Sequence, residues 1–424
     1  MKEYKLLSGE ERREEMKKLQ VLFEEEKAKG LKLDMSRGKP APAQLDLSMG
    51  LLSIEPEKII TAEDGTDARN YGILAGLPET RELFGKLLGV PAENIFVGGQ
   101  SSLSLMYACI AKAFIFGVLG GSTPWGKQSG LKFLCPVPGY DRHFRITQDF
   151  GFEMISIPMT ASGPDMELVR KYVENDPAVK GIWCVPKYSN PQGITYSAET
   201  VEAFAALKSA ADDFRIFWDN AYLVHGFKDE DDELVNIFDA CKKYGSENMV
   251  YEFASTSKIT FPGAGVAVIA ASEANMKFLL KQFGAETISH DKINQLRHIA
   301  FFKDVDGILC HMKVLAEVMR PKFDCVAEML GRELSGLGIG TWTDPNGGYF
   351  VCFEGLPGTA KRCVELCAEA GVKLTGAGAP FPYGVDPKDN VIRIAPSYPT
   401  VEQLRESMVV FCICQRMAAL ESLG

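Results

Sequence analysis

Residues 252–270 read Glu252-Phe-Ala-Ser-Thr-Ser-Lys-Ile-Thr-Phe-Pro-Gly-Ala-Gly-Val-Ala-Val-Ile-Ala270, two short apolar, β-prone stretches joined by a Ser-rich turn. Lys258 lies on that turn. Burial between two strands disfavours a charged ammonium group and lowers the pKa of a lysine. An amine that has lost its proton can attack a carbonyl carbon. The stretch therefore predicts a reactive lysine, and a surface lysine at a strand end is the alternative.

Short β-prone runs of the same kind recur along the chain, and helical stretches separate several of them. The runs are Ile95–Val97, Lys132–Cys135, Glu153–Ile157, Ile182–Val185, Arg215–Trp218, Val250–Phe253 and Val266–Ala270, and the helical stretches are Leu103–Phe116, Glu167–Glu174 and Ala198–Ala211. Because the runs are apolar without period-2 alternation, they predict an α/β fold with a mostly parallel, seven-stranded sheet flanked by helices. The last two runs are close enough to form a hairpin, so we expect one antiparallel strand.

Both ends of the chain differ in pattern from this α/β region. Ser8-Gly-Glu-Glu11 has capping-box spacing and opens a charged helix that extends to about Ala28, and the Gly/Pro-rich segment Met35–Pro42 predicts an extended arm. A long helical stretch over Asp306–Leu334 leads into mixed strands and helices. We therefore predict a helix and arm over 1–50 that pack with a small α+β domain over 301–424, and a large domain over 51–300.

The composition of the chain argues against several classes of binding partner. The 424 residues carry a net charge of -10, which argues against nucleic acid, because phosphate binding requires a basic face. The eleven cysteines form no CxxC pair, so we expect reduced thiols and no metal site. The start of the chain lacks the apolar core of a signal peptide, and no membrane partner is expected. A cytoplasmic protein is predicted.

Polar side chains follow several of the predicted strands, at the sheet edge where open parallel sheets bind ligands. Gly98-Gly-Gln-Ser-Ser102 precedes a helix and predicts a phosphate site built from Gly99, Gln100, Ser101 and Ser102. Tyr140, with His143 just behind it, could stack on a flat heteroaromatic ring. A plain turn with an N-cap serine and a half-buried tyrosine is the alternative for these two segments.

Three more residues at this edge complete a set of functional groups. Asn190 offers an amide donor on an Asn-Pro turn, Asp219 ends a buried strand and needs a cation, and Tyr222 follows three residues later. An ordinary turn and an N-cap aspartate are the alternatives. Together with Lys258 these groups meet the requirements of pyridoxal 5′-phosphate (PLP): a phosphate cup, a stacking ring, a phenolate donor, a carboxylate for a pyridinium and an amine for an aldehyde.

The order of three motifs along the chain resembles that of a known family. Asn190-Pro-x-Gly, Asp219-x-Ala-Tyr222 and Ser255-x-Ser-Lys258 occur in the order of the three cofactor motifs of class I aminotransferases of PLP fold type I, which the chain resembles over nearly its whole length. The resemblance implies that Lys258 bonds the cofactor aldehyde and then moves the proton, while Asp219 keeps the pyridine nitrogen protonated. It also implies that Ser255 and Ser257 belong to the cofactor site.

The resemblance extends to substrate and partner. Asn70-Tyr71-Gly resembles the segment whose tyrosine reaches the phosphate of a neighbouring subunit, which implies a homodimer with shared sites. Arg393 is similar to the arginine that binds the substrate α-carboxylate, a task suited to a guanidinium fork. Asn190 and Gly38 are implied as further substrate contacts. The family's phosphate-binding arginine is missing, since Gly265 stands near its position.

The segments Leu33–Pro40 and His290–His298 are similar to a divergent bacterial branch of class I, the aspartate aminotransferases. We therefore expect transfer of the amino group of aspartate or glutamate to a 2-oxo acid such as 2-oxoglutarate. An acidic substrate needs a second cation, and the candidates are Arg37, Arg142, Lys292 and Arg297, with Arg37 and Arg142 best placed. The alternatives are aromatic or 2-aminoadipate-type substrates, a PLP β-lyase or decarboxylase, and a PLP-sensing transcription regulator.

Overall fold

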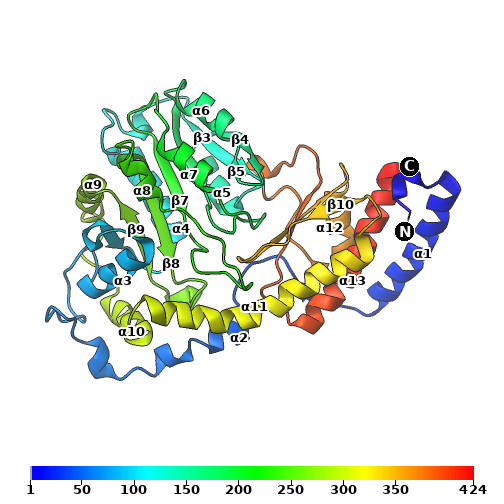
Figure 1. The fold of residues 1–424 in the computed structure, drawn as a ribbon, viewed down its shortest axis with the longest axis horizontal. Helices are drawn as coiled ribbons and strands as arrows, with labels where there is room; N and C mark the ends of the chain where they lie inside the picture. The colour runs from blue at the N-terminus through cyan, green and yellow to red at the C-terminus, as the bar shows by residue number, and fades with distance from the viewer. Residues whose placement is uncertain (1) are drawn as a thin grey trace.

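The larger part of the fold is built on one sheet of eight strands in the order β2-β9-β8-β7-β6-β3-β4-β5. A computed structural model describes residues 2–424 (Figure 1). The strands are β2 (Ile95–Val97), β3 (Lys132–Val137), β4 (Glu153–Thr160), β5 (Gly163–Pro164), β6 (Val179–Cys184), β7 (Arg215–Asp219), β8 (Val250–Ser255) and β9 (Ala267–Ala271). The central strands run parallel, whereas β9 is antiparallel to both of its neighbours.

The predicted α/β fold is confirmed, and all seven predicted runs are strands of this sheet. The antiparallel pair is β8 with β9, as expected. The predicted count of seven strands is wrong, because β5 adds an eighth strand that is antiparallel to β4 at the edge. A Gly-Pro dipeptide carries no apolar run, so the sequence pattern does not reveal a strand this short.

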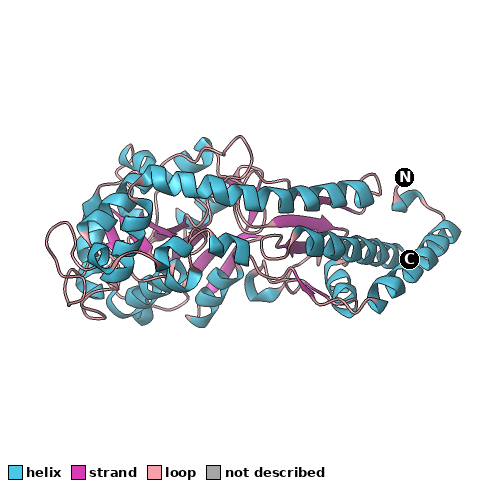
Figure 2. Ribbon diagram, turned by 90° about the horizontal axis from the view of Figure 1, so that it is seen from below, coloured by secondary structure: helices cyan, strands magenta, loops and turns pink. Residues whose placement is uncertain are grey.

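Both faces of the sheet are buried under helices. Neighbouring residues of one strand belong to different hydrophobic clusters, as Ile182 and Trp183 do in β6 and Ile216 and Phe217 do in β7. Because successive side chains point to opposite faces, each face has its own core. Figure 2 shows the strands enclosed between helices. These helices are α3 (Pro78–Leu88), α4 (Ser102–Phe116), α5 (Asp141–Asp149), α6 (Met166–Val173), α7 (Ala198–Ala205), α8 (Ile237–Lys242) and α9 (Glu273–Phe283). Helix α10 (Lys292–Phe302) contacts α3 and α11.

One predicted helix is too long. The stretch Ala198–Ala211 is helical only to Ala205. Beyond that point the backbone N–H of Ala210 donates to Val173 O at 2.9 Å, and the Ser209 hydroxyl binds the Ala211 backbone. Tertiary and local side-chain hydrogen bonds therefore replace the helical ones, although the residues themselves favour a helix.

The smaller part of the fold follows the helix α11 (Val305–Leu334), which runs along the molecule from α3 and α10 to α13 (Val401–Leu423) (Figure 1). It contains an antiparallel sheet in the order β10-β11-β13 and the helix α12 (Ala360–Glu369). The three strands are β10 (Gly340–Trp342), β11 (Val351–Gly355) and β13 (Val391–Ile394). None of the helices within residues 2–424 combines the length and the apolar character needed to cross a membrane.

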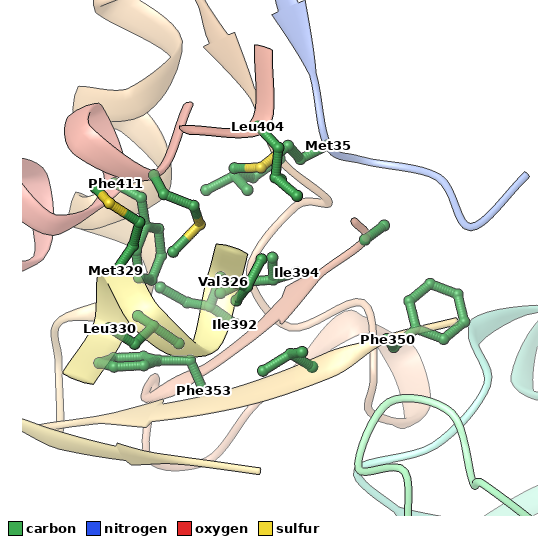
Figure 3. Close-up of a cluster of buried hydrophobic side chains, with 14 of the residues drawn as sticks. Met35, Val326, Met329, Leu330, Phe350, Phe353, Ile392, Ile394, Leu404 and Phe411 are labelled. Atoms are coloured by element: carbon green, nitrogen blue, oxygen red, sulfur yellow. The ribbon is translucent and has the colours of Figure 1, made fainter. Parts of the chain in front are cut away.

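The N-terminal segment packs on this smaller part. Helix α1 (Gly9–Ala28) begins with the predicted capping box and contacts α13. Strand β1 (Leu33–Asp34) pairs in parallel with β12 (Val372–Lys373), and α2 (Pro42–Asp46) contacts α11. Figure 3 shows Met35 among the buried side chains of this core, close to Leu404. The arm is therefore attached to the smaller part, and the domain boundaries at residues 50 and 300 stay predictions.

Candidate active site

A cleft of about 430 Å³ lies between the larger sheet and the smaller part of the fold. Its lining residues from the larger part include Tyr140, Asp141, Arg142, Asn190, Asp219, Tyr222 and Lys258, and those from the arm and the smaller part include Ser36, Arg37, Gly38, Lys39, Phe350, Lys373, Thr375 and Arg393. Tyr140, Asn190, Asp219 and Lys258 end or follow four neighbouring parallel strands, β3, β6, β7 and β8. The carboxyl edge of the sheet thus gathers residues that are far apart in the sequence.

Lys258 lies on the turn after β8 and projects its amine into the cleft. Its Nζ is 4.8 Å from the centroid of the Tyr222 ring and 5.9 Å from that of Tyr349. The Tyr349 hydroxyl donates to the backbone oxygen of Lys258 at 3.3 Å, which anchors the turn. Burial lowers the pKa of Lys258, and the Asp219 carboxylate opposes that shift. The aromatic surroundings therefore favour a neutral, nucleophilic amine.

Asp219, the last residue of β7, is a carboxylate held by one oxygen. Its Oδ2 accepts a hydrogen bond from His143 Nε2 at 3.0 Å, and both side chains are almost fully buried. The His143 ring stacks on Trp183 with 4.4 Å between the ring centroids. Asp219 Oδ1 is also buried and has no hydrogen-bond partner within residues 2–424. A buried carboxylate oxygen in this state calls for a proton donor or a cation from a ligand.

Tyr140 stands beside this carboxylate at the start of α5. Its ring centroid is 4.9 Å from that of His143, and burial together with the charge of Asp219 raises the pKa of Tyr140 to about 12. The phenol therefore keeps its proton. Asn190 is buried, and its Oδ1 accepts from Arg393 Nη1 at 3.2 Å, so its amide nitrogen remains the donor. Tyr222 is also buried, and burial raises the pKa of its phenol far above the usual value.

Arg393 reaches the cleft from β13, on the opposite side from Lys258. Its Nη1 also donates to Asp141 Oδ1 at 3.0 Å, and its Nη2 donates to Thr375 Oγ1 at 3.3 Å. The guanidinium carbon lies 4.9 Å from the centroid of the Phe350 ring. In Figure 3 Phe350 lies at the end of a strand, apart from the other labelled side chains and toward the ribbon of the larger part. The arginine is thus fixed on several sides.

The predicted phosphate loop follows β2. Gly99 has φ +87°, a backbone conformation that suits glycine, and the Ser101 hydroxyl caps the 15-residue helix α4, which begins at Ser102. Ser257 Oγ donates to Gln100 O at 3.1 Å and accepts from Ser255 Oγ at 3.1 Å. The loop, the helix start and both serines therefore adjoin one another. Backbone N–H groups at such a helix start attract anions.

Gly265 also adjoins this loop, since a Cβ atom on it would lie 3.3 Å from Gln100 O. Gly265, Gln100, His290 and Arg297 line a second cavity of about 150 Å³. Arg297, one of the candidate cations for an acidic substrate, therefore lies outside the cleft. Lys292 does as well, because its Nζ donates to Gly72 O at 3.1 Å and to Ser289 Oγ at 3.2 Å.

The predicted substrate residues Gly38, Arg37 and Arg142 line the cleft. Both arginines are exposed, and neither guanidinium has a hydrogen-bond or ion-pair partner in the part of the chain that the structure describes. Tyr71 is 80% exposed and does not line the cleft. Sequence reasoning did not identify Asp141, Thr375, Phe350, Lys39 and Lys373. Asp141 and Lys39 lie next to predicted residues, but no local pattern marks Thr375 or Phe350.

Known proteins are similar to this chain over nearly its whole length. Residues 7–424 match the family model described as aspartate amino-transferase. An aspartate aminotransferase of Corynebacterium glutamicum is 45% identical over 399 residues, which cover 94% of this chain and 92% of the relative. The crystal structure of an aspartate transaminase from the same species has a TM-score of 0.97 at 43% identity and covers 100% of this chain and 99% of that chain.

A more distant structure shares the fold. The α-aminoadipate aminotransferase of Thermus thermophilus, solved with N-(5′-phosphopyridoxyl)-L-leucine, has a TM-score of 0.70 at 21% identity and covers 95% of each chain. At that identity the likeness concerns the fold alone. The family match over residues 7–424 and the 45% identical relative go further, and the chain belongs to the aspartate amino-transferase family, as an aminotransferase of fold type I.

Proposed function

We propose that this aminotransferase uses PLP to move the amino group of aspartate or glutamate to a 2-oxo acid such as 2-oxoglutarate. One observation carries the proposal. A single cleft holds a lysine amine with a lowered pKa, a buried carboxylate with one oxygen lacking a partner within residues 2–424, and a fixed arginine. These are the groups that a pyridine aldehyde and an amino acid require.

The residues fit PLP. Asp219 Oδ1 matches a protonated ring nitrogen, because the other oxygen is already held by His143. Tyr140 lines the same cleft and offers a ring face for stacking. The glycine at 99, the start of α4, and the hydroxyls of Ser255 and Ser257 suit a phosphate. The α-aminoadipate aminotransferase of the same fold was solved with a phosphopyridoxyl ligand.

Each of these residues has its own role in the proposed reaction. When bound, PLP supplies an electron sink for the carbanion formed on the substrate. Lys258 Nζ, whose pKa is lowered by burial, takes and returns the proton. Asp219 would stabilise a positive charge on the ring nitrogen of bound PLP, and Tyr222 and Asn190 would donate hydrogen bonds to its phenolate oxygen. Arg393 binds and orients the α-carboxylate through its guanidinium fork.

The charges around the cleft favour an acidic substrate. Besides Lys258, five cationic side chains line it, and the acidic side chains in the lining are Asp141 and Asp219. The cations are Arg37, Lys39, Arg142, Lys373 and Arg393. Such an excess of positive charge attracts a substrate with two carboxylates. Arg37 and Arg142 are exposed and free of other ion pairs in residues 2–424, so they are available to the second carboxylate.

An amino-donor screen of the purified protein, followed spectroscopically at the cofactor, tests the proposal. We expect turnover of aspartate or glutamate with stoichiometric formation of a 2-oxo acid, whereas a β-lyase would release ammonia and pyruvate. Lys258→Ala should remove the visible absorbance of the lysine-bound cofactor. Turnover of aromatic or branched amino acids without either acidic one would contradict the proposed substrate, and an unchanged absorbance in the variant would contradict the role of Lys258.

A homodimer with shared sites is part of the proposal. Tyr71, at 80% exposure, and the neighbouring Ile73, at 38%, present apolar surface that a partner subunit would cover. Analytical ultracentrifugation and activity assays at decreasing protein concentration should show activity falling as the dimer dissociates. Full activity in a protein that sediments as a monomer would contradict it.

A further inference from the structure

Asp141 occupies one end of the arginine that is proposed to bind the substrate. Its Oδ1 lies 3.0 Å from Arg393 Nη1, and that same nitrogen lies 3.2 Å from Asn190 Oδ1. Thr375 Oγ1 lies 3.3 Å from Nη2. A carboxylate that binds an arginine through two parallel hydrogen bonds needs two adjacent N–H groups. The Asp141 carboxylate therefore stands where one oxygen of such a ligand would bind.

The partners of the guanidinium show which of its ends faces the cleft. Nη1 and Nη2 bond Asp141 and Thr375, which both line the cleft, whereas Nε is buried and makes no hydrogen bond within residues 2–424. The Phe350 ring covers one face, at 4.9 Å from the guanidinium carbon. At the Nη1 and Nη2 end, which these cleft residues contact, Asp141 and an incoming carboxylate compete for Nη1.

Asp141 is able to leave this position. Its side chain is 35% exposed, whereas that of Arg393 is only 7% exposed. Asp141 is the first residue of α5, where the helix dipole stabilises an acidic side chain whether or not it touches Arg393. Release of Asp141 therefore exposes a carboxylate that water and the helix start can stabilise, while the buried guanidinium acquires the substrate carboxylate in its place.

We propose that Asp141 is a resident competitor for the substrate α-carboxylate, which neutralises the buried Arg393 between turnovers and sets the affinity for both substrates. The inference rests on the proposed role of Arg393 in binding that carboxylate. The amino acid and the 2-oxo acid both carry the group, so both displace Asp141, and a ligand without a carboxylate does not. Because the competition affects ground state and transition state alike, it changes KM and leaves kcat in place.

Asp141→Asn in the holoenzyme tests the competition, because the amide keeps the shape and loses the charge. We expect KM for the acidic amino acid and for the 2-oxo acid to fall by about three- to tenfold, with kcat within about twofold. Binding of maleate, titrated at the cofactor absorbance without turnover, should tighten by a similar factor. Binding of n-propylamine, which lacks a carboxylate, should not change. Asp141→Ala is the second variant and should behave in the same way.

Two further variants separate the possible failures. Asp149→Asn removes an exposed carboxylate that pairs with Arg145 on the same helix, and it should leave KM and maleate binding unchanged. Arg393→Lys should raise KM for both substrates. If Arg393→Lys leaves KM unchanged, the proposed role of Arg393 is wrong, and the competition falls with it. If Arg393→Lys raises KM but the Asp141 variants raise it or leave it unchanged, Asp141 holds Arg393 in place and competition is refuted.

Discussion

Glu252 is a buried carboxyl group in β8, the strand next to β7, and we predict that it makes the stability of the fold depend on pH. It lies in β8, is 4% exposed, and accepts a hydrogen bond from Asn220 Nδ2 at 2.9 Å. Burial outweighs this hydrogen bond and raises the pKa of Glu252 to about 7. The ionised form is therefore disfavoured in the folded protein, and Glu252→Gln removes that cost at high pH.

The sign follows from the protonation of the folded and unfolded states. Below about pH 4 the carboxyl is protonated in both states and contributes nothing. As the pH rises, the unfolded chain loses the proton while the folded one keeps it, so stability falls until about pH 7 and then levels off. A rise from an ordinary glutamate pKa to about 7 corresponds to roughly 3 to 4 kcal/mol in total, and to about 2 to 3 kcal/mol between pH 5 and pH 8.

Urea unfolding of the parent protein and of Glu252→Gln at pH 5 and pH 8 measures this difference. We expect the free energy of unfolding of the variant, relative to the parent, to rise by about 2 to 3 kcal/mol from pH 5 to pH 8. Glu202→Gln is the control, because Glu202 is bonded to Lys243 and Tyr244 and its pKa is lowered, so that substitution gives no gain. An equal effect of Glu252→Gln at both pH values would refute the reasoning, since it would mean that the carboxyl ionises as it does in water.

The remaining predictions concern the cleft. Asp219→Asn would remove the proposed counter-charge of the PLP ring nitrogen, and breaking such a buried pair costs about 3 to 5 kcal/mol, so kcat/KM should fall by at least about 100-fold. A normal rate in this variant, measured at full cofactor loading, would contradict the pairing. Gly38→Ala places a Cβ atom 2.4 Å from Phe350 Cζ, so the arm or the ring must move and KM should rise, whereas Gly331→Ala, with no atom within 4 Å of its Cβ, should not change it. Arg37→Ala and Arg142→Ala should each be assayed with aspartate and with alanine as donor. Replacement of the residue that binds the second carboxylate should raise KM for aspartate but not for alanine. If neither variant changes KM for either donor, neither arginine binds that carboxylate.

The sequence predicted the framework well because its signals are local. Each strand of the sheet's centre is a short run whose residues are all or mostly buried, and the ends of the long helix α11 lie within a residue of the stretch expected for it. There are two errors. The extra strand β5 is formed by a turn of two residues that brings it back against β4, and the early end of α7 is followed by a hydrogen bond to a segment that is distant in the chain. Periodicity carries no information about either.

The candidate site was also predicted only in part. Lys258, Asp219 and Asn190 were identified because each follows a strand in a recognisable motif. The pairings of the site residues were not predicted, since His143 and Asp219 are 76 residues apart and Arg393 and Asp141 are 252 apart. A pairing over such a separation depends on how the sheet and the smaller domain meet, and a single sequence does not contain that information in any local pattern.

The groups proposed to bind the substrate and the groups proposed to react with it lie on different parts of the fold. Thr375 Oγ1 donates to Ser36 O at 2.6 Å and accepts from Arg393, while Ser397 Oγ donates to Lys39 O at 3.0 Å. The arm is thus bonded to the smaller part of the fold beside Arg393, whereas Asp219 ends a strand of the large sheet and Lys258 follows one. Any shift of one body relative to the other therefore changes the distance between the bound carboxylate and the reacting amine. Because the Asp141–Arg393 ion pair joins the two bodies, its replacement by a substrate carboxylate also changes what holds them together.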